Sequence, residues 1–587
     1  MSTVTEPSAP PKTTTGSDVL VRQLENYGVE VVFGVCGHTN IAVLDSLSRS
    51  KIEFITARHE QAAAHMADGY ARVTGKPGVV LVHVGPGMMN AVTGVATAAL
   101  DSVPMVVISG DIPSYYYGRH PHQEVNLHTD SNQWEIYRPF TKRVWRVDRI
   151  EDLPRFTERA FWTAQAGRPG AVLLDVPMDM WSRPQDASLA DRYALPAEFF
   201  GPALPAGTAE VIVERLAKAH RPMLYVGGGV RQPQGREDVL RLAEQLGIPI
   251  AHSLMAKGAV PDSHPLLMGM TGFWGTDLAN SYAREADVVL ALATRFAETD
   301  FNSWDERFTW KVPGTELIQI DIDANEIGRN FPVAIGAVAD IRHAARQLGD
   351  AAQSVGKRQW TDLGEEIARA RQQTWAETAE RGSLNDFPLK PERILEDVRK
   401  NLPADTIFVT DVGWNKNGIA QRYRLPDTGT FLTPGGLATM GFGPAAAVGV
   451  KYGAPGRPVV ALIGDGAMSS QLSAVPTAVE QGIQVIWVVM NNSGFGTIAD
   501  LEKSHYQVQY GTVFTDPQGD PYTPDFAALA RSCGAWGARV QSAGELTGAL
   551  QEALEAGGPA LVDVPMVNDP VPTPGHWNIN DIYQGRF

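Results

Sequence analysis

Cysteine is scarce in this chain: its 587 residues include only Cys36 and Cys533. Two cysteines cannot build the disulfide framework of a small secreted domain, and such a composition is typical of the reducing cytosol. Long apolar runs are missing too, since none approaches the ~18 residues that a transmembrane helix needs. Acidic residues outnumber basic ones by 66 to 50, and the net charge of −16 argues against nucleic acid as the main partner. We therefore expect a cytoplasmic protein that binds neither nucleic acid nor a membrane.

Length and patterning indicate several domains. A chain this long exceeds what one hydrophobic core can organise. Apolar runs alternate with amphipathic segments, which predicts an α/β fold with three consecutive doubly wound parallel-sheet domains. The expected parts are a disordered tail (1–16), a first domain (17–185), a linker (186–206), a central domain (207–350), a charged helical linker (351–390), a third domain (391–566) and a C-terminal tail (567–587).

The first domain shows the alternation most clearly. Strands are predicted at residues 29–35, 52–57, 78–84 and 104–110, and helices at residues 16–28, 42–50, 60–75 and 89–102. The domain closes with AVLLDVPMD, and the third domain closes with the similar ALVDVPMVND. This similarity indicates that the two outer domains share one topology.

The third domain contains a candidate metal site. Two apolar runs without charge, residues 459–463 and 485–490, are predicted to be buried parallel strands joined by a helix. Asp465 and Asn492 follow these runs and therefore lie at the carboxyl ends of neighbouring strands, where open α/β sheets bind ligands. A carboxylate, an amide oxygen and the free carbonyl of Gly494 are hard oxygen donors suited to Mg²⁺.

The same segment also suits a phosphate group. Gly464 and Gly466 let the backbone approach a ligand closely. A helix predicted to begin near Ala467 would direct its first N–H groups toward an anion.

The pairing of Gly-Asp-Gly (464–466) with Asn-Asn (491–492), each after an apolar strand, resembles the signature of enzymes that use thiamine diphosphate (ThDP). ARHEQAAAHMADGYAR, VGPGMMNAVTGVATA and GGLATMGFGPAAAVG resemble segments of the acetolactate synthase-like group of these enzymes. The resemblance covers nearly all of the chain after about residue 17. It implies a pyrimidine-binding domain at 17–185, a central domain that binds FAD or ADP in some relatives at 207–350, and a diphosphate-binding domain at 391–566.

The resemblance also implies roles for particular residues. Glu60 matches the glutamate that activates ThDP through its pyrimidine ring, and Met440 matches the side chain that props the cofactor in a bent shape. In the family this glutamate and the Gly-Asp-Gly motif of one site belong to different subunits, which implies a homodimer at least and a homotetramer as a common form. The implied cofactor contacts are Gly413, Asn415, Met440, Gly464, Asp465, Gly466, Ala467, Met468, Asn492, Gly494, Phe495 and Gly496, with Mg²⁺ held by Asp465, Asn492 and Gly494.

The central domain resembles the nucleotide-binding domain of relatives. A glycine turn follows the apolar segment 222–226, and acidic and basic residues follow later segments of the domain. The resemblance implies bound FAD in a structural role, and hence a flavoprotein, with ADP as the alternative. The residues concerned are Gly227, Gly228, Gly229, Arg295, Asp321 and Asp323.

Several positions depart from the acetolactate synthase pattern. His38, His83 and His122, with the neighbouring Gln123, fall on positions that face the cofactor in relatives, and histidine can move protons near neutral pH. The stretch that begins at Thr497 also differs from the pattern usual after Asn-Asn. We therefore expect an enzyme that makes or breaks a C–C bond next to the carbonyl of a small-molecule diketone or 2-keto acid, similar to cyclohexane-1,2-dione hydrolase or to a carboligase. A 2-hydroxyacyl-CoA lyase, an acetolactate synthase, a flavoprotein oxidase and a catalytically silent ThDP-fold binding protein remain as alternatives.

Overall fold

The structure is a computed structural model that describes residues 13–125, 132–196, 201–231, 233–308, 310–358, 362–425 and 428–568. Two compact units make up the chain: one comprises residues 1–199, 448–454 and 476–481, and the other comprises the rest. The first unit carries one six-stranded sheet and the second carries two, and every strand pair within these three sheets is parallel. The expected α/β fold with three parallel-sheet domains is confirmed.

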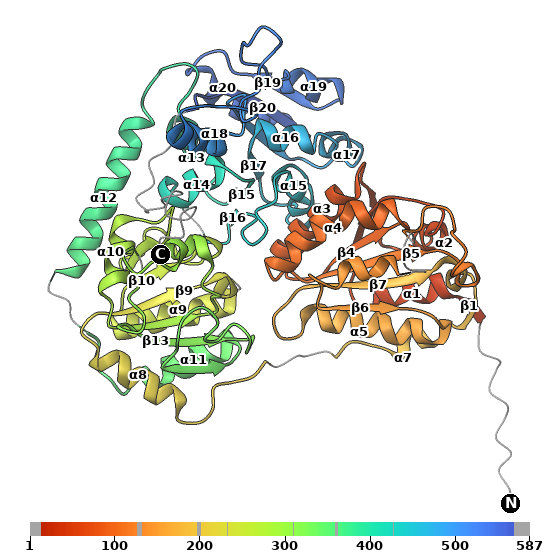
Figure 1. Ribbon diagram of the computed structural model, residues 1–587, viewed down its shortest axis with the longest axis horizontal. Coiled ribbons are helices and arrows are strands. Elements are labelled where there is room, and N and C mark those ends of the chain that lie inside the picture. Colours follow the sequence, from red (N-terminus) through yellow and green to blue (C-terminus); the bar gives the residue numbers. More distant parts are fainter. Residues whose placement is uncertain are drawn as a thin grey trace, which may run out of the picture. The chain divides into compact units, whose positions relative to one another are not determined.

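The first sheet is built from short, apolar strands, as expected for a parallel sheet covered on both faces. Helices α3 and α4 lie on one face, and α1 and α5 lie on the other (Figure 1). The strands are β2 (Val31–Gly34), β3 (Glu53–Thr56), β4 (Gly78–Val82), β5 (Met105–Asp111), β6 (Arg143–Arg146) and β7 (Ala171–Pro177). The helices are α1 (Gly16–Asn26), α2 (Ile41–Leu47), α3 (Glu60–Thr74), α4 (Pro86–Leu100), α5 (Leu153–Gln165), α6 (Met178–Trp181) and α7 (Leu189–Arg192).

The beginning of this domain differs from the prediction. Thr13–Thr15, which were expected in the disordered tail, form strand β1 and pair antiparallel with β8 (Pro184–Asp186). Thr15 then caps helix α1, since its hydroxyl accepts the N–H of Asp18 while the Asp18 carboxylate accepts the N–H of Thr15. Residues 1–12 of the expected tail lie outside the described part of the chain.

The third sheet repeats the strand order of the first. Numbered along the chain, the six strands of each sheet lie in the order 2-1-3-4-6-5, which confirms that the outer domains share one topology. The strands are β15 (Ile407–Thr410), β16 (Phe431–Leu432), β17 (Val459–Gly464), β18 (Ile486–Asn491), β19 (Trp536–Arg539) and β20 (Ala560–Pro565). The helices are α13 (Pro391–Asn401), α14 (Trp414–Arg422), α15 (Phe442–Gly453), α16 (Asp465–Ser470), α17 (Ala474–Glu480), α18 (Gly496–Tyr506), α19 (Phe526–Ser532) and α20 (Glu545–Glu555).

The central sheet has a different order, 3-2-1-4-5-6, which is that of dinucleotide-binding folds. Its strands are β9 (Pro222–Val226), β10 (Ile250–His252), β11 (Leu267–Met270), β12 (Val288–Leu292), β13 (Glu316–Asp321) and β14 (Ile335–Val338). The helices are α8 (Thr208–Lys218), α9 (Pro233–Leu246), α10 (Asp277–Glu285), α11 (Ile341–Ala352) and α12 (Leu363–Arg381). Helix α12 occupies about half of the expected linker 351–390.

The strand orders predict where ligands bind. In an open parallel sheet, a crevice forms beyond the carboxyl ends of two neighbouring strands whose connections leave in opposite directions. These strand pairs are β2 and β4 in the first sheet, β9 and β12 in the central sheet, and β15 and β17 in the third. The segments that follow these six strands contain about half of the residues singled out in the sequence, among them His38, His83, Gly413 and Asp465.

No helix among the described residues is long and apolar enough to cross a membrane.

Candidate active site

Asp465 stands at the centre of the candidate metal site. It follows β17 directly, and Gly464 pairs in register with Met490 near the end of β18, so the predicted placement at two neighbouring strand ends is confirmed. One Asp465 carboxylate oxygen accepts the N–H of Gly494 at 3.1 Å. Burial raises the pKa of this carboxyl to about 6, although backbone N–H groups, including those of Gly494 and Gly466, oppose the shift. A buried carboxylate that is costly to ionise is one that a cation can stabilise.

The two asparagines have different tasks. The Asn491 side-chain N–H donates to Asp563 at 2.8 Å, which holds the end of β18 against β20. The Asn492 side-chain N–H donates to the Asn568 side-chain oxygen at 2.9 Å. A Cβ on Gly496 would lie 2.5 Å from the Asn492 nitrogen, so a side chain where α18 begins would displace the Asn492 amide. Asn492 therefore has the fixed side chain that a metal ligand needs.

Two buried donors near the first turns of α14 and α18 have no partner among the described residues. They are the Thr497 hydroxyl and the Trp414 indole N–H. A Cβ on Gly413, where φ is +109°, would lie 3.7 Å from the Thr497 oxygen, so this hydroxyl faces the Gly413 turn. Unpaired buried donors are costly unless an acceptor fills the space. Diphosphate oxygens are acceptors, and the residues present therefore fit ThDP with Mg²⁺.

The remaining predicted contacts in this domain divide into two sets. Gly466, Met440 and Phe495 meet at one point, since a Cβ on Gly466 would lie 2.8 Å from the Phe495 ring and 3.6 Å from the Met440 sulfur. Met440 is partly exposed, as a support for a ligand must be. Ala467 and Met468 are instead buried in the core, in a helix of only six residues that begins at Asp465.

Asn415 acts on the backbone of its own turn. Its side-chain oxygen accepts the Asp411 N–H at 3.0 Å, and its side-chain N–H donates to the Val412 carbonyl at 3.2 Å. Asp411, at the end of β15, accepts the N–H groups of Gly441 and Gly443. Together these bonds fix the Gly413 turn.

In the first unit, Glu60 opens helix α3 and is buried. The Asn90 side chain on α4 donates to one Glu60 carboxylate oxygen at 3.0 Å. The other oxygen lies 3.5 Å from the position that a Cβ of Gly87 would take, so glycine leaves room beside it. Sequence reasoning missed Asn90; the available signal was a polar side chain on the uncharged helix PGMMNAVTGVATAAL.

His38 and His83 follow the neighbouring strands β2 and β4 of the same sheet and form a pair. The His83 Nδ1 lies 2.6 Å from the Val84 carbonyl, and its Nε2 lies 3.0 Å from the His38 Nδ1. A carbonyl can only accept, so His83 carries its proton on Nδ1, and the His38 Nδ1–H donates to the His83 Nε2. Burial and the charges of the neighbouring histidines lower the pKa of His38. Its Nε2 lone pair can therefore accept a proton at neutral pH.

The backbone is shaped to admit this pair. A Cβ on Gly37 would lie 1.5 Å from the His83 ring, so residue 37 must be glycine for the ring to take its place. The His122 ring lies 6.3 Å from the His38 ring between centroids, which brings the three predicted histidines together.

Gln123 is exposed, has a φ of +68°, and contributes through its backbone. Its carbonyl lies 1.7 Å from the position that a Cβ of Gly85 would take. The Gly85 N–H donates to the Gln133 side chain at 3.0 Å, and Gln133 donates to the buried Asp111 at 2.8 Å. Gln133 and Asp111 hold the loop beside His83 and were missed in the sequence, because their partners are distant along the chain.

The predicted nucleotide residues of the central domain are used in its own packing. A Cβ on Gly227 would lie 2.0 Å from the Ala293 carbonyl, and one on Gly229 would lie 2.7 Å from the Ala293 side chain, while Gly228 approaches Met255. The remaining predicted residues are also engaged locally: Asp321 accepts the Asp323 N–H, Asp323 accepts from Asn325, and the Arg295 carbonyl accepts from Asn330.

The sequence matches three family models along its length. They are described as thiamine pyrophosphate enzyme, N-terminal TPP binding domain (residues 14–131), central domain (209–348) and C-terminal TPP binding domain (411–564). Thiamine pyrophosphate is another name for ThDP.

Similar proteins match over nearly the full length. A probable acetolactate synthase large subunit of Methanocaldococcus jannaschii is 33% identical over 565 residues, which cover 94% of this chain and 91% of the relative. The acetolactate synthase large subunit of Haemophilus influenzae is 33% identical and covers 92% of both chains. That of Corynebacterium glutamicum is 34% identical and covers 95% of this chain and 87% of the relative.

The prediction of a flavoprotein with bound FAD is wrong on these findings. The three family descriptions name thiamine pyrophosphate alone, and the relatives are named as acetolactate synthases. The structure gives the physical reason for the misleading signal. Glycine follows β9 because the backbone there passes close to the Ala293 carbonyl. In a sequence, such a glycine turn looks the same as a turn that binds a nucleotide.

Proposed function

Because the chain belongs to the thiamine pyrophosphate enzyme family, we propose that it uses ThDP and Mg²⁺ to form or break a C–C bond next to a carbonyl, and that it joins pyruvate or another 2-oxo acid to a second carbonyl compound. The cofactor part rests on the buried Asp465 and on the Thr497 and Trp414 donors, which have no partner among the described residues. The substrate part rests on relatives named acetolactate synthase that match more than nine-tenths of the chain.

The chain's own groups divide the work. ThDP, when bound, supplies a nucleophilic carbon and a sink for the electron pair of the broken bond. Asp465 and Asn492 hold the metal ion with the Gly494 carbonyl, and the Thr497 and Trp414 donors bind the diphosphate. Glu60, held by Asn90, exchanges a proton at its second carboxylate oxygen, and the His38 Nε2 accepts a proton from the reactants.

A second candidate is favoured by the histidine pair. A neutral His38 with a free lone pair, fixed by His83 at 3.0 Å, suits the removal of a proton from water. Such a base would direct the reaction toward hydrolysis of a C–C bond in a cyclic or linear diketone. The 2-hydroxyacyl-CoA lyase alternative has less support, because Glu502 accepts the Tyr510 N–H and the Thr512 hydroxyl and so holds its own loop.

A substrate panel tests this proposal. The purified chain with ThDP and Mg²⁺ is given pyruvate, cyclohexane-1,2-dione or a short 2-hydroxyacyl-CoA, and the products are identified by mass spectrometry. We expect pyruvate to be consumed with release of CO₂ and formation of a C–C bond. A paired assay of His38→Gln separates the second candidate, because loss of a general base lowers hydrolysis by about 10²- to 10⁴-fold while carboligation is less affected. Turnover of the CoA thioester alone contradicts both candidates.

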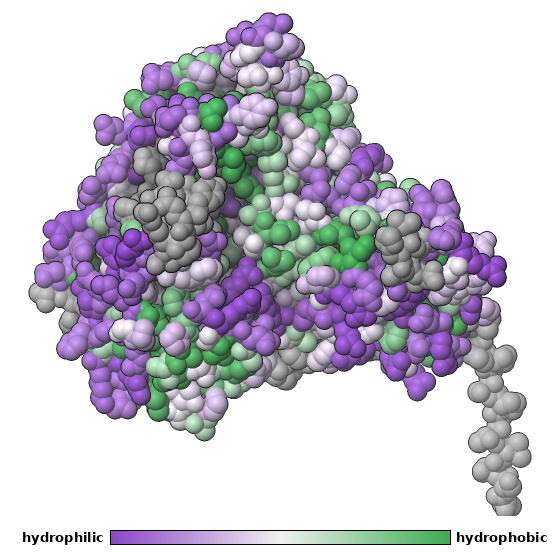
Figure 2. Space-filling view, viewed as in Figure 1, coloured by the Kyte–Doolittle hydropathy of each residue, from purple (hydrophilic) through white to green (hydrophobic). Residues whose placement is uncertain are grey.

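The proposal also includes a homodimer. Helix α4 carries no charged residue, yet Met89 on it is 45% exposed. Figure 2 shows apolar side chains gathered over α3 and α4, right of centre. An uncharged surface helix of this kind is typical of an interface. The relatives' names also call them large subunits, so a smaller partner chain is a further candidate for this enzyme.

Met89→Lys is expected to shift the purified protein from a dimer toward the 63.5 kDa monomer, because a charge cannot be buried unpaired in an interface. Light scattering after size-exclusion chromatography measures the mass. Val211→Lys on α8, which replaces a side chain of similar exposure (47%), is the matched control. An unchanged mass of Met89→Lys would exclude α4 from the interface.

A further inference from the structure

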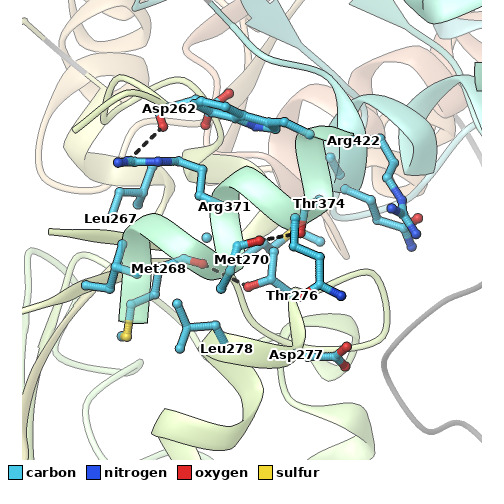
Figure 3. A pocket seen from close by; sticks show the side chains of 18 of the residues that line it. Asp262, Leu267, Met268, Met270, Thr276, Asp277, Leu278, Arg371, Thr374 and Arg422 are labelled. Atoms are coloured by element: carbon cyan, nitrogen blue, oxygen red, sulfur yellow. Dashed lines mark hydrogen bonds between the residues drawn. The ribbon is translucent and has the colours of Figure 1, made fainter. Parts of the chain in front are cut away.

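The second unit contains a cavity of about 370 Å³ that no predicted site residue lines. It lies among the edge strand β11, the start of α10, helix α12 and the C-terminal turn of α14 (Figure 3). Its volume is at the lower end of the range typical of pockets for small organic ligands. The glycine turn Gly227–Gly229 is not part of its wall.

One side of helix α12 lines this cavity. Ile367, Ala370, Arg371, Thr374 and Trp375 line the space, and their spacing of three and four residues places them on one side of the helix. Ile367 at one end of this stripe packs in a hydrophobic core, and the stripe as a whole borders the cavity. The helix that connects the central and third domains therefore forms one wall of a binding space.

Gln421 supplies the strongest indication of a ligand. It lines the cavity from α14 and is 9% exposed. Its side-chain oxygen and nitrogen are both buried and have no hydrogen-bond partner among the described residues. A buried amide with neither group satisfied carries a desolvation cost. A ligand that offers an acceptor and a donor side by side would remove that cost.

The wall holds three acidic and three basic side chains. Lys257 and Asp262 neutralise each other at 2.7 Å, and Arg422 faces Glu377 at 3.4 Å. Arg371 donates to the backbone carbonyls of His264 at 2.8 Å and Asp262 at 3.5 Å, and no carboxylate among the described residues forms an ion pair with it. The guanidinium of Arg371 is thus a positive charge held in place by two neutral carbonyls, which favours an anion at this point of the wall.

One part of the wall is apolar. Met268, Met270 and Leu278 lie opposite α12 and α14 (Figure 3). Asp277, the remaining acid of the wall, is exposed to solvent.

We propose that this cavity is a second ligand site, which binds a small organic acid with an apolar chain and an amide, or an equivalent donor–acceptor pair, next to the acid group. The Arg371 guanidinium binds the acid, the Gln421 side chain binds the donor–acceptor pair, and the methionines and Leu278 bind the apolar chain. This proposal does not rest on the proposed reaction, since none of the cavity's residues belongs to the catalytic or cofactor groups.

N-acetyl-leucine is a suitable probe, because it carries a carboxylate, an amide and an isobutyl group. Isothermal titration calorimetry of the full chain is expected to show saturable binding with one site per chain. Two matched probes isolate the contributions: N-acetyl-leucinamide lacks the charge and 4-methylpentanoate lacks the amide, and each is expected to bind at least tenfold more weakly. Equal binding of all three probes, or no saturation by the first at millimolar concentration, overturns the proposal.

Two variants tie the binding to the named residues. Gln421→Leu is expected to weaken N-acetyl-leucine binding at least tenfold and to raise the melting temperature of the ligand-free protein, because it removes an unsatisfied buried amide without a change in size. Arg371→Met is expected to weaken the binding of N-acetyl-leucine at least tenfold but to leave that of N-acetyl-leucinamide unchanged. Both variants are expected to keep the turnover of the wild type within twofold. Wild-type affinity in both variants would refute the assignment.

Discussion

Glu60→Gln is expected to lower kcat by at least a hundredfold and to leave ThDP binding within a few-fold of the wild type. The glutamine amide has nearly the size of the carboxyl group and still offers an oxygen to the Asn90 side chain, which holds Glu60 at 3.0 Å. The buried start of α3 therefore keeps its shape. What is lost is the carboxyl group's ability to exchange a proton, and proton transfer by a positioned side chain contributes about 10²- to 10⁴-fold to a rate.

Deuterium exchange at the C2 carbon of bound ThDP, followed by proton NMR after an acid quench, measures this effect before any substrate is chosen. The exposed Glu151→Gln, the same change at a site 66% exposed, is the matched control and should exchange like the wild type. Exchange at the wild-type rate in Glu60→Gln would show that this carboxyl does not activate the cofactor.

Asp465→Asn is expected to have opposite effects on the ligand-free and the loaded protein. Burial raises the Asp465 pKa from 3.8 to about 6, so the ionised carboxylate destabilises the empty fold. An acid with a raised pKa contributes stability that is fully present below its unfolded pKa and is lost as the pH rises through about 6. A shift of this size corresponds to about 3 kcal/mol. At pH 7.5 the neutral asparagine avoids that cost, so the ligand-free variant should melt at a higher temperature than the wild type.

Binding of Mg²⁺ and ThDP is expected to reverse this order of melting temperatures. Asparagine keeps one oxygen but loses the charge that attracts Mg²⁺, and we expect the affinity for Mg²⁺ with ThDP to fall at least a hundredfold, more than the 10- to 100-fold typical of residues behind the metal ligands. Calorimetric melting with and without Mg²⁺ and ThDP measures both effects, with the exposed Asp405→Asn as the control. In the wild type the stabilisation by Mg²⁺ and ThDP should shrink as the pH falls through about 6, because protons then compete for Asp465. A variant that gains as much from loading as the wild type would exclude Asp465 as a ligand.

The sequence predicted best what depends on neighbours along the chain. Asp465 and Asn492 follow uninterrupted apolar runs, and such runs become buried parallel strands whose ends lie side by side, as β17 and β18 do. The similar endings of the outer domains anticipated one strand order for both. The edge strand β6 gave no such signal, because Arg143–Arg146 begins and ends with arginine and pairs on one side only.

Contacts between distant residues could not be predicted. The His38–His83 pair requires glycine at position 37, because the His83 ring occupies the space that a side chain there would take. Asn90 becomes a partner of Glu60 only because α3 and α4 pack together. Conversely, the glycines after β9 resembled a nucleotide turn, although their small size serves the close passage of Ala293. In each case the determining distance joins residues that are far apart in the chain.

Helix α14 has a consequence for control of the enzyme. It begins at Trp414, beside the Gly413 turn, and ends at Arg422, beside the amide of Gln421. The proposed cofactor site and the proposed organic-acid site therefore lie at the two ends of one helix about 13 Å long. A ligand at one end that favours one position of the helix would change the affinity for the ligand at the other end. Thermodynamic linkage requires the two factors to be equal. The cofactor and the organic acid would then be effectors of each other, and the same measurement could be made from either side.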